Sequence, residues 1–346
     1  MRYFATSIPG LAAILADEIA SLPGVTVGQG HECDGRNDVV PFSASSSAQD
    51  LFGLRVSEDI FVEVSSARRG RTARDLVGRL VDDRALDQAL SVYGAHVQPL
   101  RARMTFRVIV RVLSERQFLR STLRDELTRR IGASKPRWRV GDPASLEFWA
   151  LETRLGLFRL GLRLTGSSMR HRDGRVVERP GALRPTVAAA MVRLLSRPSF
   201  DGVLLDPFCG SGTILTEAAA VGWRPLGADL DPEAVKVARS NVQGAAWLLV
   251  ADARRLSLVA QSVSAVASNL PFGKQYRIQG SASRWFDAVL QEMTRVTRPE
   301  ATIVLLVPPL PAFERALAKE SLLGDVQRTN LRLLGMPTTL WRLRRK

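Results

Sequence analysis

Apolar and polar positions follow one pattern in the first half of the chain and another in the second. In the first half, alternating segments such as 3–6 and 105–112 predict strands with one buried face, and residues 11–20 carry apolar positions at helical spacing. From about residue 186, short and largely apolar runs predict strands buried on both faces, as in a parallel sheet, and most of them are followed by a helical segment. The chain is therefore expected to combine an α+β half with an α/β half.

The second half repeats the order strand then helix, which predicts a doubly wound sheet. Five strands are expected, at 203–205, 225–229, 247–252, 264–269 and 302–307. The expected helices are at 185–195, 212–221, 232–241, 283–296 and 313–320. Segments 325–333 and 339–343 predict a closing antiparallel hairpin.

Residues 204–213, with the sequence LLDPFCGSGT, join the first of these strands to its helix. Gly210 and Gly212 lack a Cβ, so the chain can reverse tightly there, and a ligand can lie against bare backbone and face the free N–H groups of the new helix. Such a turn is typical of nucleotide-binding enzymes, although it also occurs as a purely structural turn.

Three successive strands of the second half end in an acidic residue. Asp229 follows Asp206 by 23 residues, a spacing typical of a carboxylate that accepts both ribose hydroxyls of a nucleoside lying across the strand ends. Asp252 ends the third strand, where it is placed to reach an adenine amine. These residues predict a cofactor that contains a nucleoside.

The fourth strand runs into Asn269, Leu270, Pro271 and Phe272. With the glycine turn and the acids at the strand ends, this loop resembles class I methyltransferases that use S-adenosylmethionine, in which an (Asn/Asp)-Pro-Pro-aromatic loop serves the methylation of exocyclic base amines. The resemblance implies a seven-stranded Rossmann-like sheet of order 3-2-1-4-5-7-6. Leu270 departs from the proline that is common at its position.

The chemistry of an exocyclic amine explains why such a loop is needed. The lone pair is delocalised into the ring, so the amine is a poor nucleophile. If the Asn269 side-chain oxygen and the Leu270 carbonyl accept hydrogen bonds from the two N–H groups of the amine, its lone pair turns toward the methyl group for in-line displacement. Phe272 would stack on the base. Because the second acceptor is a backbone carbonyl, the departure at Leu270 is expected to matter little. Pro271 fixes one backbone angle of the loop.

The resemblance assigns two sets of site residues. The expected catalytic residues are those of the loop, namely Asn269, Leu270, Pro271 and Phe272. The expected contacts to S-adenosylmethionine are Asp206, Phe208, Gly210, Gly212, Thr213, Asp229, Leu230, Asp252, Ala253 and Asn269.

The chain is strongly basic. It carries 49 Lys and Arg against 34 Asp and Glu, a formal net charge of +15, which favours a polyanionic partner. Arg far outnumbers Lys, as codon bias in a GC-rich genome would produce, so the distribution is better evidence than the total. Residues 1–65 hold 3 basic and 9 acidic residues, whereas residues 66–140 hold 18 basic and 7 acidic. A basic block beside an acidic one predicts a localised surface for binding nucleic acid.

The first half resembles the ferredoxin-like and THUMP domains of tRNA guanosine-N2 methyltransferases. The resemblance is carried by the opening strand with Pro9 and Gly10 after it, by the strand at 105–108, and by segment 160–162 ahead of Met169. It implies a ferredoxin-like domain, a THUMP RNA-binding domain, a linker and a methyltransferase domain, at 1–65, 66–165, 166–185 and 186–346. In that family the THUMP domain binds the acceptor end of tRNA.

Candidate contacts to RNA are basic side chains outside the cofactor site. They are Arg120, Arg124, Arg129 and Arg130 in the predicted helix 117–131, Arg170 and Arg172 in the linker, and Lys274 after the catalytic loop. Phosphate contacts of this kind set the position of the RNA rather than read its sequence. The alternative for the helix is a solvated surface, on which Glu115, Asp125 and Glu126 pair with the arginines at little gain in stability.

Several classes of protein are disfavoured. No apolar run approaches the length of a membrane span, and the first residues lack the pattern of a signal peptide, so a cytoplasmic protein is expected. Two cysteines, Cys33 and Cys209, do not make a disulfide framework or a cysteine-based zinc site. The three histidines lack metal-ligand spacing, so no metal is expected. Cys209 is expected to pack beneath the ligand, and the protein is expected to be a monomer.

These expectations lead to one function and leave alternatives open. The chain is expected to transfer a methyl group from S-adenosylmethionine to the exocyclic N2 amine of a guanosine in tRNA. Guanine-N2 methylation of ribosomal RNA is a close alternative, whereas DNA adenine-N6 methylation shares the loop but leaves the first half unexplained. A catalytically silent factor that binds cofactor and RNA is the alternative from another class, and the intact loop from Asn269 to Phe272 argues against it.

Overall fold

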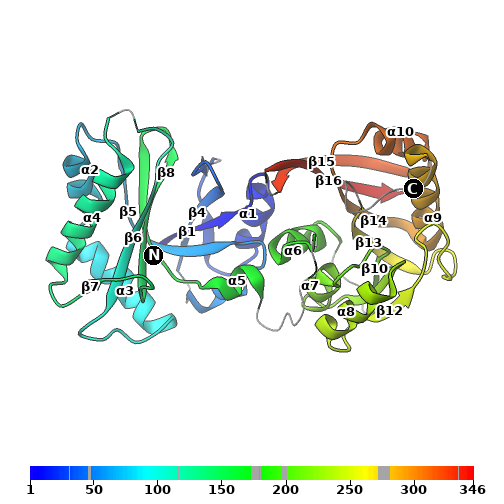
Figure 1. Ribbon diagram of the computed structural model, residues 1–346, viewed down its shortest axis with the longest axis horizontal. Helices are drawn as coiled ribbons and strands as arrows, with labels where there is room; N and C mark the ends of the chain where they lie inside the picture. The colour runs from blue at the N-terminus through cyan, green and yellow to red at the C-terminus, as the bar shows by residue number, and fades with distance from the viewer. Residues whose placement is uncertain are drawn as a thin grey trace. The chain divides into compact units, whose positions relative to one another are not determined.

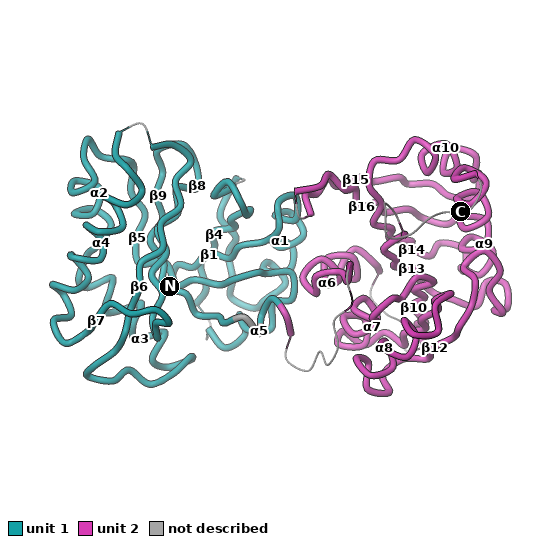
Figure 2. Tube along the Cα trace, in the orientation of Figure 1, with its two compact units in different colours: residues 1–170 teal, residues 171–346 magenta. Residues whose placement is uncertain are grey.

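The computed structural model describes residues 1–30, 32–45, 48–115, 117–172, 179, 181–196, 201–271, 281–333 and 335–346. The chain forms two compact units, unit 1 from Met1 to Arg170 and unit 2 from His171 to Lys346, which are coloured separately in Figure 2. Each unit is built around one sheet (Figure 1).

Unit 1 contains a nine-stranded sheet of order β2-β4-β1-β5-β9-β8-β6-β7, with β3 paired to β4. Its strands are β1 (Arg2–Ser7), β2 (Val25–Val27), β3 (Glu32–Cys33), β4 (Asp38–Ala44), β5 (Asp59–Arg68), β6 (Thr105–Arg111), β7 (Arg139–Val140), β8 (Leu146–Arg154) and β9 (Leu157–Arg163). Its helices are α1 (Ala12–Ala20), the 3-10 helix η1 (Ala48–Gly53), α2 (Ala73–Leu80), α3 (Asp83–His96) and α4 (Arg120–Ser134), and α5 (Ser167–His171) follows them at the unit boundary.

Strand β5 joins the two parts of this sheet. It pairs with β1 on one side and with β9 on the other, and its first six residues are buried. The rings of Phe4 and Phe61 stack across β1 and β5 with centroids 4.7 Å apart. Because β5 runs through the expected boundary between residues 65 and 66, the ferredoxin-like and THUMP parts share one continuous sheet. The division into two domains within unit 1 stays a prediction.

Unit 2 contains a seven-stranded sheet of order β12-β11-β10-β13-β14-β16-β15, so the expected order 3-2-1-4-5-7-6 is confirmed. The strands are β10 (Val203–Asp206), β11 (Arg224–Asp229), β12 (Trp247–Val250), β13 (Val263–Asn269), β14 (Thr297–Val307), β15 (Leu323–Leu333) and β16 (Met336–Arg345). The helices are α6 (Pro185–Arg193), α7 (Thr213–Ala219), α8 (Pro232–Val242), α9 (Ala282–Val296) and α10 (Pro311–Lys319).

The core of unit 2 explains why its strands read as wholly apolar runs. Leu205 and Ile303 are fully buried, in the parallel strands β10 and β14. A row of aromatic rings, Phe286, Phe313 and Trp341, packs edge to face between α9, α10 and β16. Parallel strands buried in this way end at one edge of the sheet, and ligands bind outside such an edge. The loops after β10, β11 and β13 therefore meet there.

Differences between expected and observed elements occur mainly at short edges. The helix expected at 117–131 begins at Arg120, because Leu119 has extended backbone angles of φ −74° and ψ 148°. The segment Ala48–Gly53 forms the short 3-10 helix η1. The edge strands β3 and β7 have two residues each, too few to show alternation.

Candidate active site

The glycine turn after β10 has the conformation that its sequence predicts. Gly210 and Gly212 have positive φ angles of +51° and +80°, which favour glycine. A Cβ at Gly212 would lie 3.1 Å from Cγ1 of Val242, whereas a Cβ at Gly210 would meet no described atom within 4 Å. Gly212 is thus constrained by helix α8, and the space in front of Gly210 is open. The Gly212 N–H donates to the carbonyl of Cys209 over 2.7 Å, which closes the turn ahead of α7.

Asp229, at the end of β11, is tied to this turn. One of its carboxylate oxygens accepts from the Gly210 N–H at 2.9 Å, and the other accepts from the Asp231 N–H at 3.0 Å. Among the described residues, no lysine or arginine pairs with it. The two hydrogen bonds fix the plane of the carboxylate and leave acceptor capacity on both oxygens.

Asp206, at the end of β10, is the most deeply buried acid of the site, with 1% of its surface exposed. Its Oδ1 accepts from the Phe208 N–H at 3.1 Å and from the Ser268 hydroxyl at 2.6 Å. Burial raises the pKa of Asp206 to about 7, and the nearby charge of Asp229 acts in the same direction, although the two hydrogen bonds oppose them. Within the described residues no cationic side chain offsets this carboxylate.

Asn269 ends strand β13, which lies between β10 and β14. Its side-chain oxygen is buried and has no hydrogen-bond partner in the described part of the chain. The next residue, Leu270, donates its N–H to the Leu306 carbonyl at 3.1 Å, and its side chain is fully buried in the core of unit 2. The backbone is therefore anchored directly beside an unsatisfied acceptor. A buried polar atom without a partner is costly, so this oxygen is a candidate contact for a ligand.

The rest of the catalytic loop is only partly described. Pro271 is half-buried. Phe272 and Lys274 fall in the segment 272–280, outside the described residues.

Two residues that the sequence did not single out support the site. Ser268 donates the short hydrogen bond to Asp206 across neighbouring strands. Trp285, on α9, packs against Phe208 with ring centroids 5.5 Å apart and so braces the glycine turn. No local motif marks either residue, because both act through contacts with strands or turns far away in the chain. The polar Ser268 between the apolar Ala267 and the loop was the only available signal.

The residues expected around the adenine differ in exposure and in hydrogen bonding. Asp252 is held by Arg254, with the closest oxygen and nitrogen 2.6 Å apart, and this hydrogen-bonded ion pair keeps the pKa of Asp252 below its usual value. Leu230 is 69% exposed, so it can cover a flat ring, whereas Ala253 is buried. Thr213 is half-buried at the start of α7, with its hydroxyl 3.4 Å from that of Ser211.

Cys209 lies within the glycine turn and is 4% exposed. Burial raises the pKa of its thiol, with the charges of Asp206 and Asp229 adding to the effect. A thiol of this kind is a poor nucleophile, since the thiolate is the reactive form.

The described residues also bear on metals and membranes. They contain no group of three or more His, Cys, Asp or Glu side chains placed to hold a metal ion. No helix in the described ranges is long and apolar enough to cross a membrane.

The basic candidates for RNA contact are mostly engaged in ion pairs. On α4, Arg124 pairs with Asp125, Arg129 with Glu126, and Arg130 with Asp83. Arg120, at the start of α4, is exposed. Arg170 lies 3.5 Å from Asp59 in unit 1, and Arg172 lies 3.0 Å from Glu217 in unit 2. An arginine that is paired in this way still presents donors to a phosphate, but its charge is partly offset.

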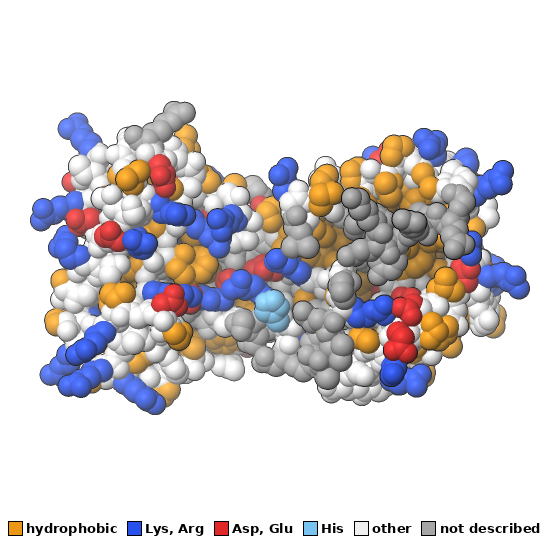
Figure 3. Space-filling view, viewed as in Figure 1, with side chains coloured by type: hydrophobic (Ala, Val, Ile, Leu, Met, Phe, Trp, Pro, Cys, Tyr) orange, Lys and Arg blue, Asp and Glu red, His pale blue; other side chains and the backbone are white. Residues whose placement is uncertain are grey.

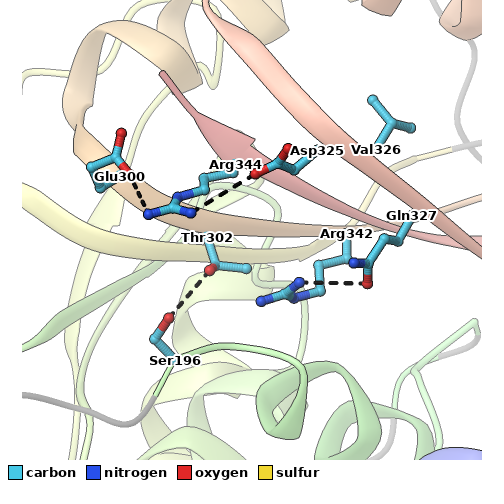
Figure 4. A pocket seen from close by; sticks show the side chains of 8 residues that line it. All are labelled: Ser196, Glu300, Thr302, Asp325, Val326, Gln327, Arg342 and Arg344. Atoms are coloured by element: carbon cyan, nitrogen blue, oxygen red, sulfur yellow. Dashed lines mark hydrogen bonds and ion pairs between the residues drawn. The ribbon is translucent and has the colours of Figure 1, made fainter.

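A separate hollow of about 450 Å³ in unit 2 lies between the ends of β14, β15 and β16 (Figure 4). Arg344 pairs there with Glu300 and Asp325, and Arg342 hydrogen-bonds to Gln327 and to the Leu194 carbonyl. None of the expected site residues lines it. The charged side chains that line the hollow pair with one another. We therefore interpret these contacts as links within the closing hairpin, not as a second active site.

Comparison with known proteins agrees with this geometry. Residues 172–336 match the family model described as RMKL-like, methyltransferase domain. A tRNA (guanine(6)-N2)-methyltransferase from Thermus thermophilus is 30% identical over 326 residues, which cover 90% of this chain and 91% of the relative. The U6 snRNA (guanine-N(2))-methyltransferase THUMPD2 of Bos taurus is 38% identical over 133 residues, 36% of this chain and 25% of the relative.

Among solved structures, that of TrmN from Thermus thermophilus superposes with a TM-score of 0.80 at 24% identity, covering 100% of this chain and 99% of the other. At this identity the superposition establishes the fold. The near full-length match in sequence establishes more, because it spans both units. The chain belongs to the family of THUMP-containing, S-adenosylmethionine-dependent tRNA guanine-N2 methyltransferases.

Proposed function

We propose that this protein transfers the methyl group of S-adenosylmethionine to the exocyclic N2 amine of a guanosine in tRNA. The observation that carries the proposal is the buried side-chain oxygen of Asn269, which has no hydrogen-bond partner among the described residues and lies at the end of β13, next to the strand that leads into the glycine turn. An amide oxygen of this kind accepts a hydrogen bond from an amine N–H and leaves the proton on the nitrogen.

The described residues fit the cofactor. The open face of Gly210 gives room for a ligand against the backbone, and the oriented carboxylate of Asp229 is suited to the two ribose hydroxyls. Asp206 lacks a cationic partner among the described residues, and a ligand ammonium group would supply one. We assign Asp229 to the ribose and Asp206 to the ammonium end.

The other expected contacts complete this assignment. Leu230 would cover the adenine and Asp252 would accept from its amine, since Arg254 already orients the Asp252 carboxylate. Phe208, Thr213 and Ala253 would line the space between them.

At the reacting centre the protein acts by orientation. S-adenosylmethionine, when bound, supplies a methyl group on a positively charged sulfur. Asn269 Oδ1 and the Leu270 carbonyl would accept hydrogen bonds from the two N–H groups of the guanine amine and so turn its lone pair out of the ring system. Asn269 is neutral and takes no proton, so the proton is lost to solvent after transfer. Phe272, in the segment outside the described residues, would stack on the base.

For the nucleotide we propose position 6 of tRNA. The Thermus thermophilus relative, of which the match to this chain covers 91%, is named for that position. The U6 snRNA enzyme matches over 133 residues only, 36% of this chain. Relatives that share the reaction and act on different RNAs support a division of labour, in which unit 2 performs the chemistry and unit 1 selects the RNA.

Mass spectrometry of nucleosides, which identifies the modification, and of nuclease fragments, which locates it in the RNA, tests the proposal. tRNA and ribosomal RNA from a deletion strain should be compared with RNA from the same strain carrying the wild-type gene or the Asn269→Ala gene. We expect N2-methylguanosine at position 6 of tRNA only with the wild-type gene. A methyl group that appears instead in ribosomal RNA, or on a ring nitrogen, would contradict it.

We further propose that one copy of the chain acts in the cytoplasm on the acceptor end of tRNA. The excess of basic residues in segment 66–140 supports binding of a polyanion by unit 1. Sedimentation of the purified complex should give one chain per tRNA, and nuclease footprinting should protect the acceptor end. A complex with two chains, or protection confined to the anticodon arm, would refute this part.

A further inference from the structure

Unit 1 has a hollow of about 330 Å³ beside the start of β6, where the loop after α3 lies next to β7. It is lined by Gln98, Pro99, Arg101, Arg103, Met104, Thr105, Arg137, Arg139 and Ser145. In Figure 3, Lys and Arg side chains gather at the lower left, over the part of unit 1 that carries α3 and β7 in Figure 1. We call the four arginines of this lining the β7 arginines.

Backbone pairing brings these arginines together from two distant segments. Strands β6 and β7 are parallel, with Thr105 opposite Arg139, and the Arg139 N–H donates to the Met104 carbonyl at 3.0 Å. Trp138 packs its ring against Phe106, with centroids 6.2 Å apart, which holds the approach to β7 on the core. Arg139 is therefore fixed by a hydrogen-bonded strand pair, whereas Arg101 and Arg103 lie just before β6, in a segment outside any helix or strand.

Hydroxyl groups lie between the arginines. The hydroxyls of Ser145 and Thr105 form a hydrogen bond, with their oxygens 3.3 Å apart. The backbone N–H of Ser145 also donates to the Thr105 hydroxyl at 3.0 Å. Gln98 donates its amide to the phenol of Tyr93 at 3.0 Å. These contacts position polar groups that can add neutral hydrogen bonds to an anion held by the guanidinium groups.

The charge of the hollow is not balanced by the protein. Arg101, Arg103, Arg137 and Arg139 are all exposed, no carboxylate belongs to the lining, and none of the four forms an ion pair within the described ranges. Three of the four arginines of α4 do pair with acids. Two like charges about 8 Å apart in water repel by about 0.5 kcal/mol, so clustering the four costs stability unless an anion offsets them.

We propose that the β7 arginines form a discrete site for backbone phosphates of the RNA substrate. The proposal rests on the proposed function, because it takes RNA as the substrate. Small-molecule sites of similar volume are lined mainly by apolar side chains, whereas four of the nine lining residues here are arginines. Guanidinium groups bind phosphate through two parallel hydrogen bonds, and such contacts position an RNA without reading its sequence.

Binding of a tRNA transcript across a salt series, measured with the full-length protein, tests the site. Arg137→Ala combined with Arg139→Ala should weaken tRNA binding by at least about tenfold near 0.1 M salt. It should also reduce the slope of log affinity against log salt by about 2, since each lost phosphate contact removes about one unit. The maximum rate at saturating tRNA should change little, because the reacting groups lie in unit 2.

The matched control removes two arginines elsewhere on unit 1. Arg74→Ala with Arg84→Ala also deletes two exposed side chains without described ion pairs, so it lowers the net charge equally. We expect this variant to lose less than about threefold in affinity. Arg139→Lys, which keeps the charge but not the paired hydrogen bonds, should fall between wild type and the double variant.

The outcomes separate this proposal from the proposed function. Unchanged tRNA affinity in the Arg137/Arg139 variant, or an equal loss in the Arg74/Arg84 control, would overturn the phosphate site even if the wild-type protein methylates tRNA. Failure of the wild-type protein to methylate any tRNA guanine would instead overturn the proposed function. Unchanged circular dichroism and urea unfolding in every variant verify that unit 1, which carries the substitutions, remains folded.

Discussion

Several buried carboxylates of unit 1 and the two acids of the candidate site in unit 2 have different partners. In unit 1, Arg159 bonds to both Glu32 and Glu63, at 2.8 and 2.6 Å. Arg69 likewise bonds to Glu152 at 2.7 Å. In unit 2, Asp206 and Asp229 receive only N–H and O–H donors from the described residues. The named acids of unit 1 are paired with arginines, whereas the two site acids of unit 2 have no cationic partner among the described residues.

The pKa values of Glu32 and Asp206 follow the same contrast. Burial raises the pKa of Glu32, but hydrogen bonds and the charge of Arg159 outweigh burial, so the pKa is lowered. For Asp206 burial dominates, and the pKa rises to about 7. A completed buried ion pair serves the fold, whereas an acid held in place without a cation has spare binding capacity for a ligand. Variants of the two kinds of acid and of their partners test this difference.

Removing the shared arginine of unit 1 should have the largest effect. Arg159→Ala leaves Glu32 and Glu63 buried without their main partner, and breaking a buried pair costs about 3–5 kcal/mol. Urea unfolding followed by circular dichroism should register a loss of this size. Arg129→Ala, which removes the exposed pair with Glu126 on α4, is the control and should cost less than about 1 kcal/mol. Equal losses would show that burial does not distinguish the two pairs.

The contribution of Asp206 to stability should depend on pH in the opposite way to that of an ion-paired carboxylate. Because the folded pKa of Asp206 is about 7, above the ordinary value of 3.8, the folded protein holds a proton there that the unfolded chain releases. Its contribution to stability is present at low pH and is lost as pH rises from about 4 to about 7. One pKa unit corresponds to about 1.4 kcal/mol, so the whole change is at most about 4 kcal/mol.

Asp206→Asn isolates this contribution, since the amide keeps an acceptor for Phe208 and Ser268. Without cofactor, the variant should gain in stability relative to wild type as pH rises from 5 to 7, and the difference should then level off. Urea unfolding at several pH values measures it. Profiles that stay parallel would mean that Asp206 is ionised throughout, as an ion-paired acid would be.

At the reacting centre, Asn269→Ala removes the unpartnered acceptor. Turnover should fall by about 10²–10³-fold, the scale for losing one preorganised polar group at a reacting centre, while cofactor affinity changes much less. Asn269→Asp keeps an acceptor oxygen, as the family loop allows, and should retain more activity. Single-turnover methyl transfer to a tRNA pool measures all three proteins. A wild-type rate for Asn269→Ala would remove this residue from the mechanism.

The smallest of these effects concerns the ribose acid. Asp229→Ala should weaken S-adenosylmethionine binding by about 1.5–3 kcal/mol, the scale for hydrogen bonds to a charged group. Calorimetry measures the affinity. Glu233→Ala, an exposed acid in the first turn of α8, serves as the charge control. If both variants bind the cofactor as wild type does, the ribose contact belongs to another residue.

Leu270 illustrates what a motif leaves out. The role that the loop motif predicts for Leu270 involves only its carbonyl, and on that ground a proline at this position would be equivalent. In the structure, Leu270 donates its N–H to Leu306 and buries its side chain fully. A proline would lack both the donor and the packed side chain, so leucine here has a structural role as well as the proposed one.

The sequence predicted the apolar strands of unit 2, the glycine turn and the acids near the strand ends, while the strand order was implied by the family resemblance. Each predicted feature depends on local signals, namely apolar runs, residues that tolerate positive φ, and the rule that parallel strands end at one edge. The family resemblance supplied the expected role of Asn269 in the same way, from four adjacent residues.

Tertiary structure alone decided which charges are paired and which are left over. Ser268 reaches Asp206 across 62 residues, and Arg159 reaches Glu32 across 127. Parallel pairing of β6 with β7 sets Arg103 near Arg139, although a whole helix separates them in the chain. Strand pairing and burial bring about such contacts between distant segments, and no local pattern encodes them. For this reason the sequence predicted where ligands bind, while the fold decided which acids and arginines remain to bind them.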